Sequence, residues 1–177
     1  MRSFLSLAAA GTLLATPALA QTAAQPCLTK GEFTALATYA MPSAIEGVTK
    51  RCAGTLGTDA YLAKNGNALT VRYAKDKNAA WPQAKAAFFK FSASKGDQTT
   101  NFMRQLPDES LRPIVDTVVE GMASQEIALK DCAAIDEFVR LLAPLPARNT
   151  AGLLTLIMAF ADEPDAGKLG GFTICKG

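Results

Sequence analysis

Apolar residues recur at spacings of three and four along most of the chain, as they do on the buried side of an α-helix. The clearest series is Trp81, Ala84, Phe88 and Phe91. Runs that alternate apolar and polar residues are too short to predict a sheet, although Gly171 to Lys176 could form a short extended piece. The pattern therefore predicts an all-α fold, a compact bundle of about seven to eight short helices.

Capping residues, prolines and glycines predict where these helices begin and end. Thr29 with Glu32 and Ser43 with Glu46 each have the spacing of a capping box, so we expect two helices separated at Pro42. A short helix opened by Thr58-Asp59 should end at Asn65-Gly66. Further helices are expected from Asn67 through Tyr73, from Asn78 to about Lys95, from Asp97 to about Leu106, beyond Pro107 through Met122, from Cys132 to Leu142, and from Asn149.

Two later segments are expected to supply core residues. The longest apolar run, Ala151 to Ala161, is too short to span a bilayer and reads as a buried core helix, so no transmembrane segment is predicted after the leader. The helix beyond Pro107 should turn one apolar stripe inward, composed of Leu111, Ile114, Val115, Val118 and Met122.

Residues 1–20 have the features of a cleaved secretory signal peptide. Arg2 precedes an apolar stretch that ends at Pro17, and Ala18-Leu19-Ala20 forms a small-x-small cleavage site. Cleavage would leave residues 21–177, which have the size of a single all-α domain. Cys27 lies too far from the cleavage site for a lipid anchor. The protein is therefore predicted to be periplasmic or secreted.

Four cysteines follow the leader, and an even number in an exported chain favours two disulfides. If each end of the chain forms a helical hairpin, Cys27 pairs with Cys52 and Cys132 pairs with Cys175, so that two disulfide-stapled hairpins result. A four-thiolate metal site or a redox dithiol is the alternative, but the chain contains no C-x-x-C motif. We expect neither a metal site nor a cofactor.

Charge is unevenly distributed in a nearly neutral chain. Residues 64–95 carry seven basic side chains and one acidic side chain, whereas residues 97–137 carry three basic and nine acidic ones. One interpretation is a basic binding face for an anionic partner, with Phe89 as an exposed aromatic among the lysines. The candidate residues are Lys64, Arg72, Tyr73, Lys75, Lys77, Trp81, Lys85, Phe89 and Lys90.

The other interpretation, which we favour, is that the basic and acidic segments face and neutralise each other, with Phe89 against a neighbouring helix. In either case nucleic acid is not the expected partner, because an exported chain with a net charge near zero does not suit phosphate binding.

The sequence excludes several kinds of catalysis. It contains no histidine, so His-dependent nucleophilic catalysis and HExxH zinc sites are absent. Ser92 to Lys95 matches S-x-x-K without its companion motifs, and Asp162 to Asp165 lacks the order of a calcium loop. Carboxylate catalysis remains possible, although no pair stands out among Glu32, Glu46, Asp59, Asp108 and Glu109.

We therefore expect an exported, non-catalytic helical protein that binds an unknown protein or an anionic envelope component. One alternative is a carboxylate-dependent cell-wall hydrolase. The other is a small apolar-molecule carrier, which would need a cavity between the Phe-rich helix and the helix of Leu153 to Phe160.

Overall fold

The computed structural model describes residues 27–93, 98–160 and 174–175. Within these ranges the chain forms seven α-helices, a short 3-10 helix and no β-strand, so the all-α prediction is confirmed. The expected leader, residues 1–20, lies outside the described residues. The elements are α1 (Lys30–Cys52), α2 (Tyr61–Ala74), α3 (Lys77–Ala93), α4 (Gln98–Arg104), α5 (Asp108–Glu126), η1 (Leu129–Asp131), α6 (Cys132–Leu142) and α7 (Ala147–Phe160).

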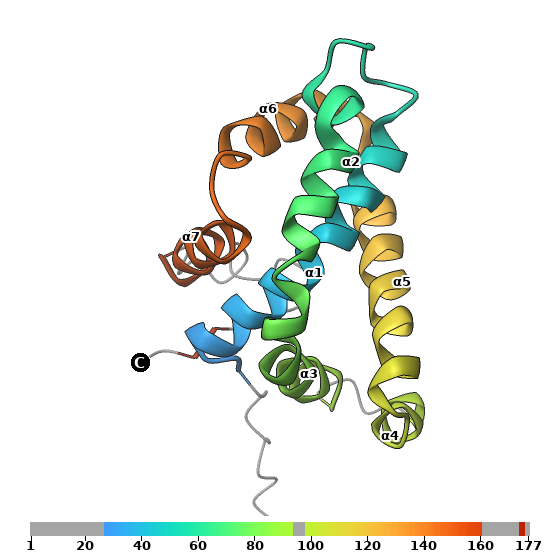
Figure 1. Ribbon diagram of the computed structural model, residues 1–177, viewed down its shortest axis with the longest axis vertical. Helices are drawn as coiled ribbons and strands as arrows, with labels where there is room; N and C mark the ends of the chain where they lie inside the picture. Colours follow the sequence, from blue (N-terminus) through green and yellow to red (C-terminus); the bar gives the residue numbers. More distant parts are fainter. Residues whose placement is uncertain (1–26, 94–97, 161–173, 176–177) are drawn as a thin grey trace, which may run out of the picture.

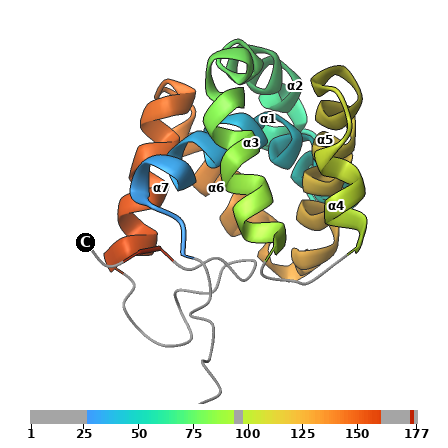
Figure 2. The same ribbon diagram turned by 90° about the horizontal axis from the view of Figure 1, so that it is seen from below.

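The helix α1 lies at the centre, and α2, α3, α5 and α7 all pack against it. Figure 1 shows α5 along one side of α1 and α7 on the other, and Figure 2 shows the same order from below. The two remaining helices attach to this group, since α4 contacts α3 and α6 contacts α2. The position of α1 therefore determines where most of the other helices lie.

The sequence predicts a break in α1 at Pro42, and this prediction is wrong. The helix continues through Pro42, and Ser43 does not cap a second helix, because its hydroxyl donates to Asp116 Oδ1 at 3.2 Å. A proline inside a helix costs about 3 kcal/mol. Tyr39 and Ile45 are buried on the two sides of Pro42, and fully burying a large apolar side chain contributes about 1.5–3 kcal/mol. Packing along both halves of α1 therefore outweighs the local cost of Pro42.

Two glycines allow neighbouring helices to approach α1 closely. A Cβ atom on Gly47 of α1 would lie 2.4 Å from the carbonyl oxygen of Glu120 on α5. A Cβ atom on Gly66 of α2 would lie 2.8 Å from Thr49 Oγ1 on α1. The predicted helix end at Asn65-Gly66 is therefore wrong: α2 runs through both residues, and Gly66 provides close packing rather than a turn.

The apolar core has one cluster at each half of α1. The cluster at the N-terminal half joins α1 to α3 and α5 around Leu36, Trp81 and Leu111. The cluster at the C-terminal half joins α1 to α2, α6 and α7 around Ile45 and Leu69. The buried residues of the two clusters therefore come from different helices around α1, although α5 also contacts the C-terminal half at Gly47.

The disulfides join Cys27 to Cys175 and Cys52 to Cys132, so the predicted pairing is wrong. That pairing required a turn at Pro42. Instead, α1 is a continuous helix of 23 residues, about 35 Å long at 1.5 Å per residue. Cys27 precedes its first residue and Cys52 is its last, so these two sulfur atoms cannot meet. At each end of α1, the cysteine bonds instead to a cysteine from a later part of the chain: Cys27 to Cys175 and Cys52 to Cys132.

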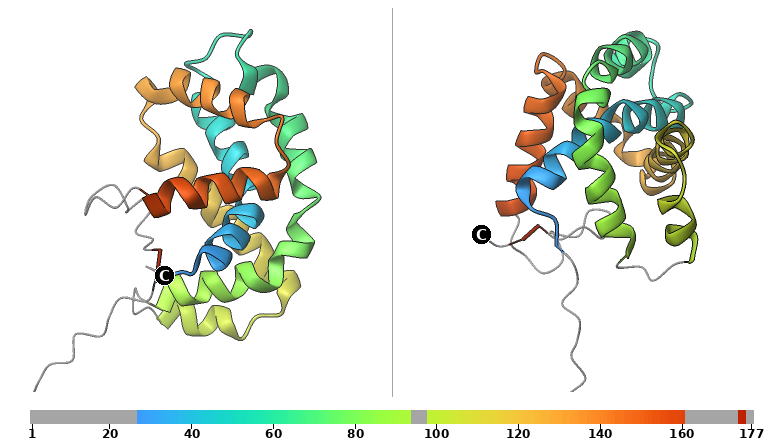
Figure 3. Two further views of the ribbon diagram at one scale, coloured as in Figure 1. Left: turned by 90° about the vertical axis from the view of Figure 1, so that its left-hand side faces the viewer. Right: turned by 60° about the horizontal axis from the view of Figure 1, so that its bottom comes forward.

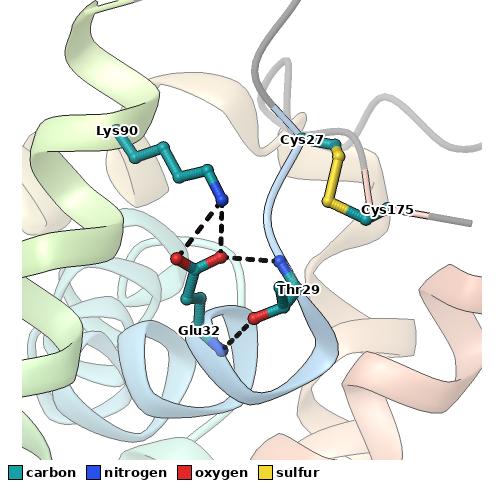
Figure 4. The surroundings of a disulfide bond; sticks show 5 residues. All are labelled: Cys27, Thr29, Glu32, Lys90 and Cys175. Carbon is teal, nitrogen blue, oxygen red and sulfur yellow. Dashed lines mark hydrogen bonds and ion pairs between the residues drawn. A yellow bond between two sulfur atoms is a disulfide. The ribbon is translucent and has the colours of Figure 1, made fainter. Parts of the chain in front are cut away.

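The start of α1 is fixed by several contacts, which Figure 4 shows beside the Cys27–Cys175 disulfide. The predicted capping box is confirmed: the Glu32 N–H donates to Thr29 Oγ1 at 3.2 Å, and the Thr29 N–H donates to Glu32 Oε2 at 2.7 Å. The Cys175 N–H donates to the carbonyl oxygen of Leu28 at 2.8 Å, beside an isolated parallel bridge between Leu28 and Ile174. The last described residues of the chain therefore hold its first ones.

The start of α2 is capped by a side chain from another helix. The two oxygens of Asp136 on α6 accept hydrogen bonds from the backbone N–H groups of Tyr61 and Leu62, at 3.0 and 2.6 Å. Arg140, one turn further along α6, pairs with Glu137. A carboxylate at a helix N-terminus satisfies free N–H donors, so Asp136 fixes α2 relative to α6.

We predict that Gly47→Ala lowers the free energy of unfolding by about 1–3 kcal/mol, because the added methyl group meets the backbone of α5. Gly152→Ala is the matched control, since a Cβ atom there meets nothing within 4 Å. It should raise the free energy of unfolding by up to about 1 kcal/mol, because alanine favours a helix over glycine. Urea unfolding followed by circular dichroism measures both changes, and effects of the same sign would contradict the close approach at Gly47.

We also predict that the two disulfides are reduced at different rates. Cys52 and Cys132 are fully buried, whereas Cys27 and Cys175 are partly exposed, and thiol–disulfide exchange requires access. Limited dithiothreitol without denaturant, followed by alkylation and peptide mass mapping, should label Cys27 and Cys175 first. Labelling of all four cysteines at one rate would contradict this expectation.

Candidate functional site

The aromatic residues of the candidate basic face do not form an exposed surface. Tyr73, Trp81 and Phe89 are only 2%, 2% and 6% exposed. The guanidinium of Arg104, on α4, lies 4.7 Å from the centre of the Phe89 ring. Phe89 therefore lies against a neighbouring helix, and its interpretation as an exposed binding aromatic is wrong.

Most cations of the candidate face are already paired. Lys77 and Lys85 on α3 form ion pairs with Asp116 and Asp108 on α5, each at 2.6 Å. These two pairs join the basic segment to the acidic segment, as the neutralisation hypothesis predicts. Two further lysines pair elsewhere, Lys90 with Glu32 and Lys64 with Asp59.

Two candidate cations remain outside these ion pairs. The guanidinium of Arg72 donates to the carbonyl oxygen of Ala143, at the end of α6. The side chain of Lys75 has no ion pair within the described ranges. The structure therefore leaves few of the candidate cations available to an anionic partner.

Asp108, Trp81 and Lys85 form a polar joint between α3 and α5. The indole N–H of Trp81 donates to Asp108 Oδ2 at 2.6 Å, and the Lys85 ammonium donates to Asp108 Oδ1 at 2.6 Å. The guanidinium of Arg112 lies 4.9 Å from the centre of the Trp81 ring. Lys85 first, and then Trp81, hold the pKa of Asp108 below its ordinary value of 3.8. These contacts hold α5 against α3.

Four of the five carboxylates considered for hydrolysis have structural partners, and the fifth, Glu109, is exposed without an ion pair among the described residues. Glu46 pairs with Lys50 at 2.9 Å, while Glu32, Asp59 and Asp108 form the ion pairs given above. The backbone of Thr29 first, and then Lys90, lower the pKa of Glu32. A general acid in glycoside hydrolysis needs a raised pKa, which is the opposite of what Glu32 and Asp108 have. Neither Glu32 nor Asp108 therefore has the raised pKa of a general acid.

A pocket of about 250 Å³ lies between α3 and α7 on the surface of α1. Four residues of α1 line it with helical spacing, namely Gly31, Thr34, Ala35 and Thr38. Ala80 and Gln83 of α3 and Arg148 of α7 complete the lining. The pocket lies where the carrier hypothesis requires a cavity, but its lining is mixed rather than apolar.

The left view of Figure 3 faces the side of the molecule where α6 and α7 lie. The side of α7 facing α1 contains Ala147, Thr150, Ala151 and Thr155, all buried, and Thr155 Oγ1 lies 2.8 Å from Thr34 Oγ1 of α1. The opposite side carries large apolar residues at spacings of three and four: Leu153, Leu156, Ile157 and Phe160, at 39%, 46%, 48% and 81% exposed. We call these four residues the α7 outer face.

The α7 outer face shows that the expected burial of the whole 151–161 run is wrong. The helix is apolar on both sides, and the sequence signal that could have revealed a second apolar side is the spacing of 153, 156, 157 and 160. The predicted inward stripe of α5 is also only partly right. Leu111 and Val115 are buried, but Ile114, Val118 and Met122 are 37–43% exposed.

Other sequence features lead to no site. Lys95 of the S-x-x-K match and the whole of Asp162 to Asp165 lie outside the described residues. In the described ranges, no group of three or more Cys, Asp or Glu side chains is placed to hold a metal ion. No helix within those ranges is long and apolar enough to cross a membrane.

Comparison of the chain with protein-family models, with curated proteins and with solved structures gave no match. Interpretation of function therefore depends on the two surface features given above, the α7 outer face and the pocket.

The fluorescence of Trp81, the single tryptophan, should report the charge of Asp108. Because the pKa of Asp108 is lowered in the folded state, its stabilisation is complete above the ordinary value of 3.8 and is lost as the pH falls through the lower folded value. As the pH is lowered, the emission of the wild-type protein should therefore change only below pH 3.8. This change should occur at a higher pH than unfolding, which circular dichroism measures.

Asp108→Asn should remove this acid transition. Glu109→Gln is the control, because Glu109 is exposed and forms no ion pair among the described residues. It should leave the transition in place, and an unchanged transition in Asp108→Asn would refute the assignment.

Proposed function

We propose that the chain is an exported, non-catalytic helical protein that binds another protein through the α7 outer face. The observation that carries this proposal is the set of four large apolar side chains exposed at i, i+3, i+4 and i+7 on one helix. This spacing is the one by which a helix inserts side chains into an apolar groove of a partner.

Charge favours a protein over an anionic envelope component as the partner. Arg148 is the only ionisable residue of α7, and it lies in the first turn, away from the α7 outer face. An anionic polymer would need free cations, but Lys64, Lys77, Lys85 and Lys90 are engaged in ion pairs. An uncharged apolar face fits an apolar groove or helix of a partner protein better.

Export, to the periplasm or to the outside of the cell, belongs to the same proposal. The leader-like sequence of residues 1–20 supports it. The two disulfides support it independently, because disulfides persist mainly in oxidising compartments.

The test begins with a photo-crosslinking residue at position 157 in the exported protein, followed by identification of the crosslinked chain by mass spectrometry. The purified partner is then titrated with wild-type protein, Leu156→Asp and Val71→Asp by calorimetry. Leu156→Asp should weaken binding by roughly ten- to a hundredfold, since it removes a large apolar contact. Val71→Asp is the matched control, because Val71 is also exposed, at 61%, but lies on α2.

Equal losses of affinity for the partner in Leu156→Asp and Val71→Asp would overturn the proposal. A crosslink only to a second copy of the chain would also overturn it and assign the α7 outer face to self-association. Flotation with phosphatidylglycerol vesicles that is lost in Leu156→Asp would assign the face to a lipid surface instead.

A further inference from the structure

The pocket between α1, α3 and α7 exists because small residues meet where three helices cross. Gly31 and Ala35 on α1 and Ala80 on α3 have side chains too small to fill the space between the helices. Ala35 and Ala80 are 8% and 7% exposed, so they form a floor below the surface. The pocket is therefore part of the helix packing and does not depend on a mobile side chain.

The polar groups of the pocket divide into acceptors and donors. The hydroxyl of Thr38, only 3% exposed, donates to the carbonyl oxygen of Thr34 at 2.7 Å, so its oxygen can only accept from a ligand. The hydroxyls of Thr34 and Thr155 can donate to Lys30 O and Ala151 O, and they also lie 2.8 Å from each other. Since each hydroxyl has one proton, Thr34 also has no donor left for a ligand.

Donors come from the opposite rim. The guanidinium of Arg148 has no hydrogen bond or ion pair within the described ranges. By contrast, the arginines of α1, α2 and α5, namely Arg51, Arg72 and Arg112, all donate to carbonyl or amide oxygens. Gln83 adds an exposed amide beside it. Among the described residues, the pocket therefore combines a cation without a partner, buried hydroxyl acceptors and a small apolar floor.

We propose that this pocket binds a small carboxylate that also carries a hydroxyl or ammonium group. The carboxylate suits the planar guanidinium of Arg148, which can hold both oxygens, and the second group can donate to Thr38 Oγ1. One cation in the lining balances a single negative charge, so a carboxylate fits better than a phosphate group, which carries close to two. This site is independent of the proposed protein contact, because the α7 outer face does not line the pocket.

Size limits the ligand further. The pocket volume of about 250 Å³ corresponds to roughly eight water molecules at about 30 Å³ each. It lies just below the usual range for pockets of drug-sized ligands, roughly 300–1,000 Å³. The ligand is therefore a molecule of the size of a hydroxy acid or an amino acid, not a lipid or a sugar chain.

The test is a titration of the full mature protein, with both disulfides intact, followed by ¹H–¹⁵N correlation spectra. The probes are lactate, acetate, inorganic phosphate and propylene glycol. Lactate should produce saturable shifts at the amides of Gly31 and Thr38 and at the side-chain amide of Gln83. Acetate should bind more weakly because it lacks the hydroxyl group, and neutral propylene glycol should not bind.

Three variants assign the contacts. Arg148→Gln should weaken lactate binding by roughly ten- to a hundredfold, the range expected for a lost hydrogen bond to a charged group. Thr38→Val should weaken lactate by roughly two- to tenfold and leave acetate unchanged. Arg140→Gln removes an exposed arginine on α6 that is paired with Glu137, and it should change the binding of neither lactate nor acetate. Circular dichroism melts establish that each variant is folded.

Absence of saturable shifts at the pocket residues with lactate would overturn the proposal. An affinity for lactate that is unchanged in Arg148→Gln would overturn it too. Phosphate binding as tight as lactate binding would overturn the carboxylate assignment. Leu156→Asp should leave the lactate titration unchanged, so failure of this site and failure of the proposed protein contact give different results.

Discussion

The structure depends on α1 remaining a single helix through Pro42. Because this helix is continuous, its two ends lie far apart, and each end has its own disulfide, Cys27–Cys175 at the start and Cys52–Cys132 at the finish. By loop-closure entropy, crosslinks that close loops of this length contribute roughly 4–5 kcal/mol each. The first ties the two ends of the described chain together, and the second ties α1 to α6. The disulfides therefore fix the positions of elements around α1 and do not close local hairpins.

Small residues on α1 have two different consequences along its length. At Gly47 the backbone of α5 fills the space that a side chain would occupy, and the result is close packing. At Gly31 and Ala35 no neighbouring residue enters, since Ala80 on the facing helix is also small, and the result is a pocket. A small residue on α1 therefore produces tight packing where the facing helix comes close, and a pocket where the facing residue is also small. Only the tertiary arrangement distinguishes the two.

The sequence predicts the helical content, and within two residues it predicts the bounds of the helices over 77–93, 98–104 and 132–142. It fails where a local signal competes with tertiary packing. Pro42 and Asn65-Gly66 are strong local stop signals, yet both lie inside helices, because burial along α1 outweighs their local cost. The disulfide prediction fails for the same reason, since it depended on the break at Pro42.

The candidate site could be predicted only in part. The sequence indicates that the basic and acidic segments could neutralise each other, and the ion pairs Lys77–Asp116 and Lys85–Asp108 follow that pattern. It does not reveal the pocket, because Gly31, Ala80 and Arg148 are far apart in the chain and none of them belongs to a motif. Hydrophobic periodicity gives the residues of one helix face, but it does not say which face another helix will cover.

The arrangement of α7 is the reverse of an ordinary amphipathic helix. Alanine and threonine make up most of its buried residues, with Met158 as the one large apolar residue among them, whereas leucine, isoleucine and phenylalanine predominate on the exposed side. Stability of this chain alone would favour the opposite arrangement, because burial contributes in proportion to apolar area. Small residues let α7 lie close to α1, and its hydroxyls bond across the contact at Thr34 and Thr155. The larger apolar area is thereby kept on the surface, which is the placement expected of a helix whose outer side contacts a partner.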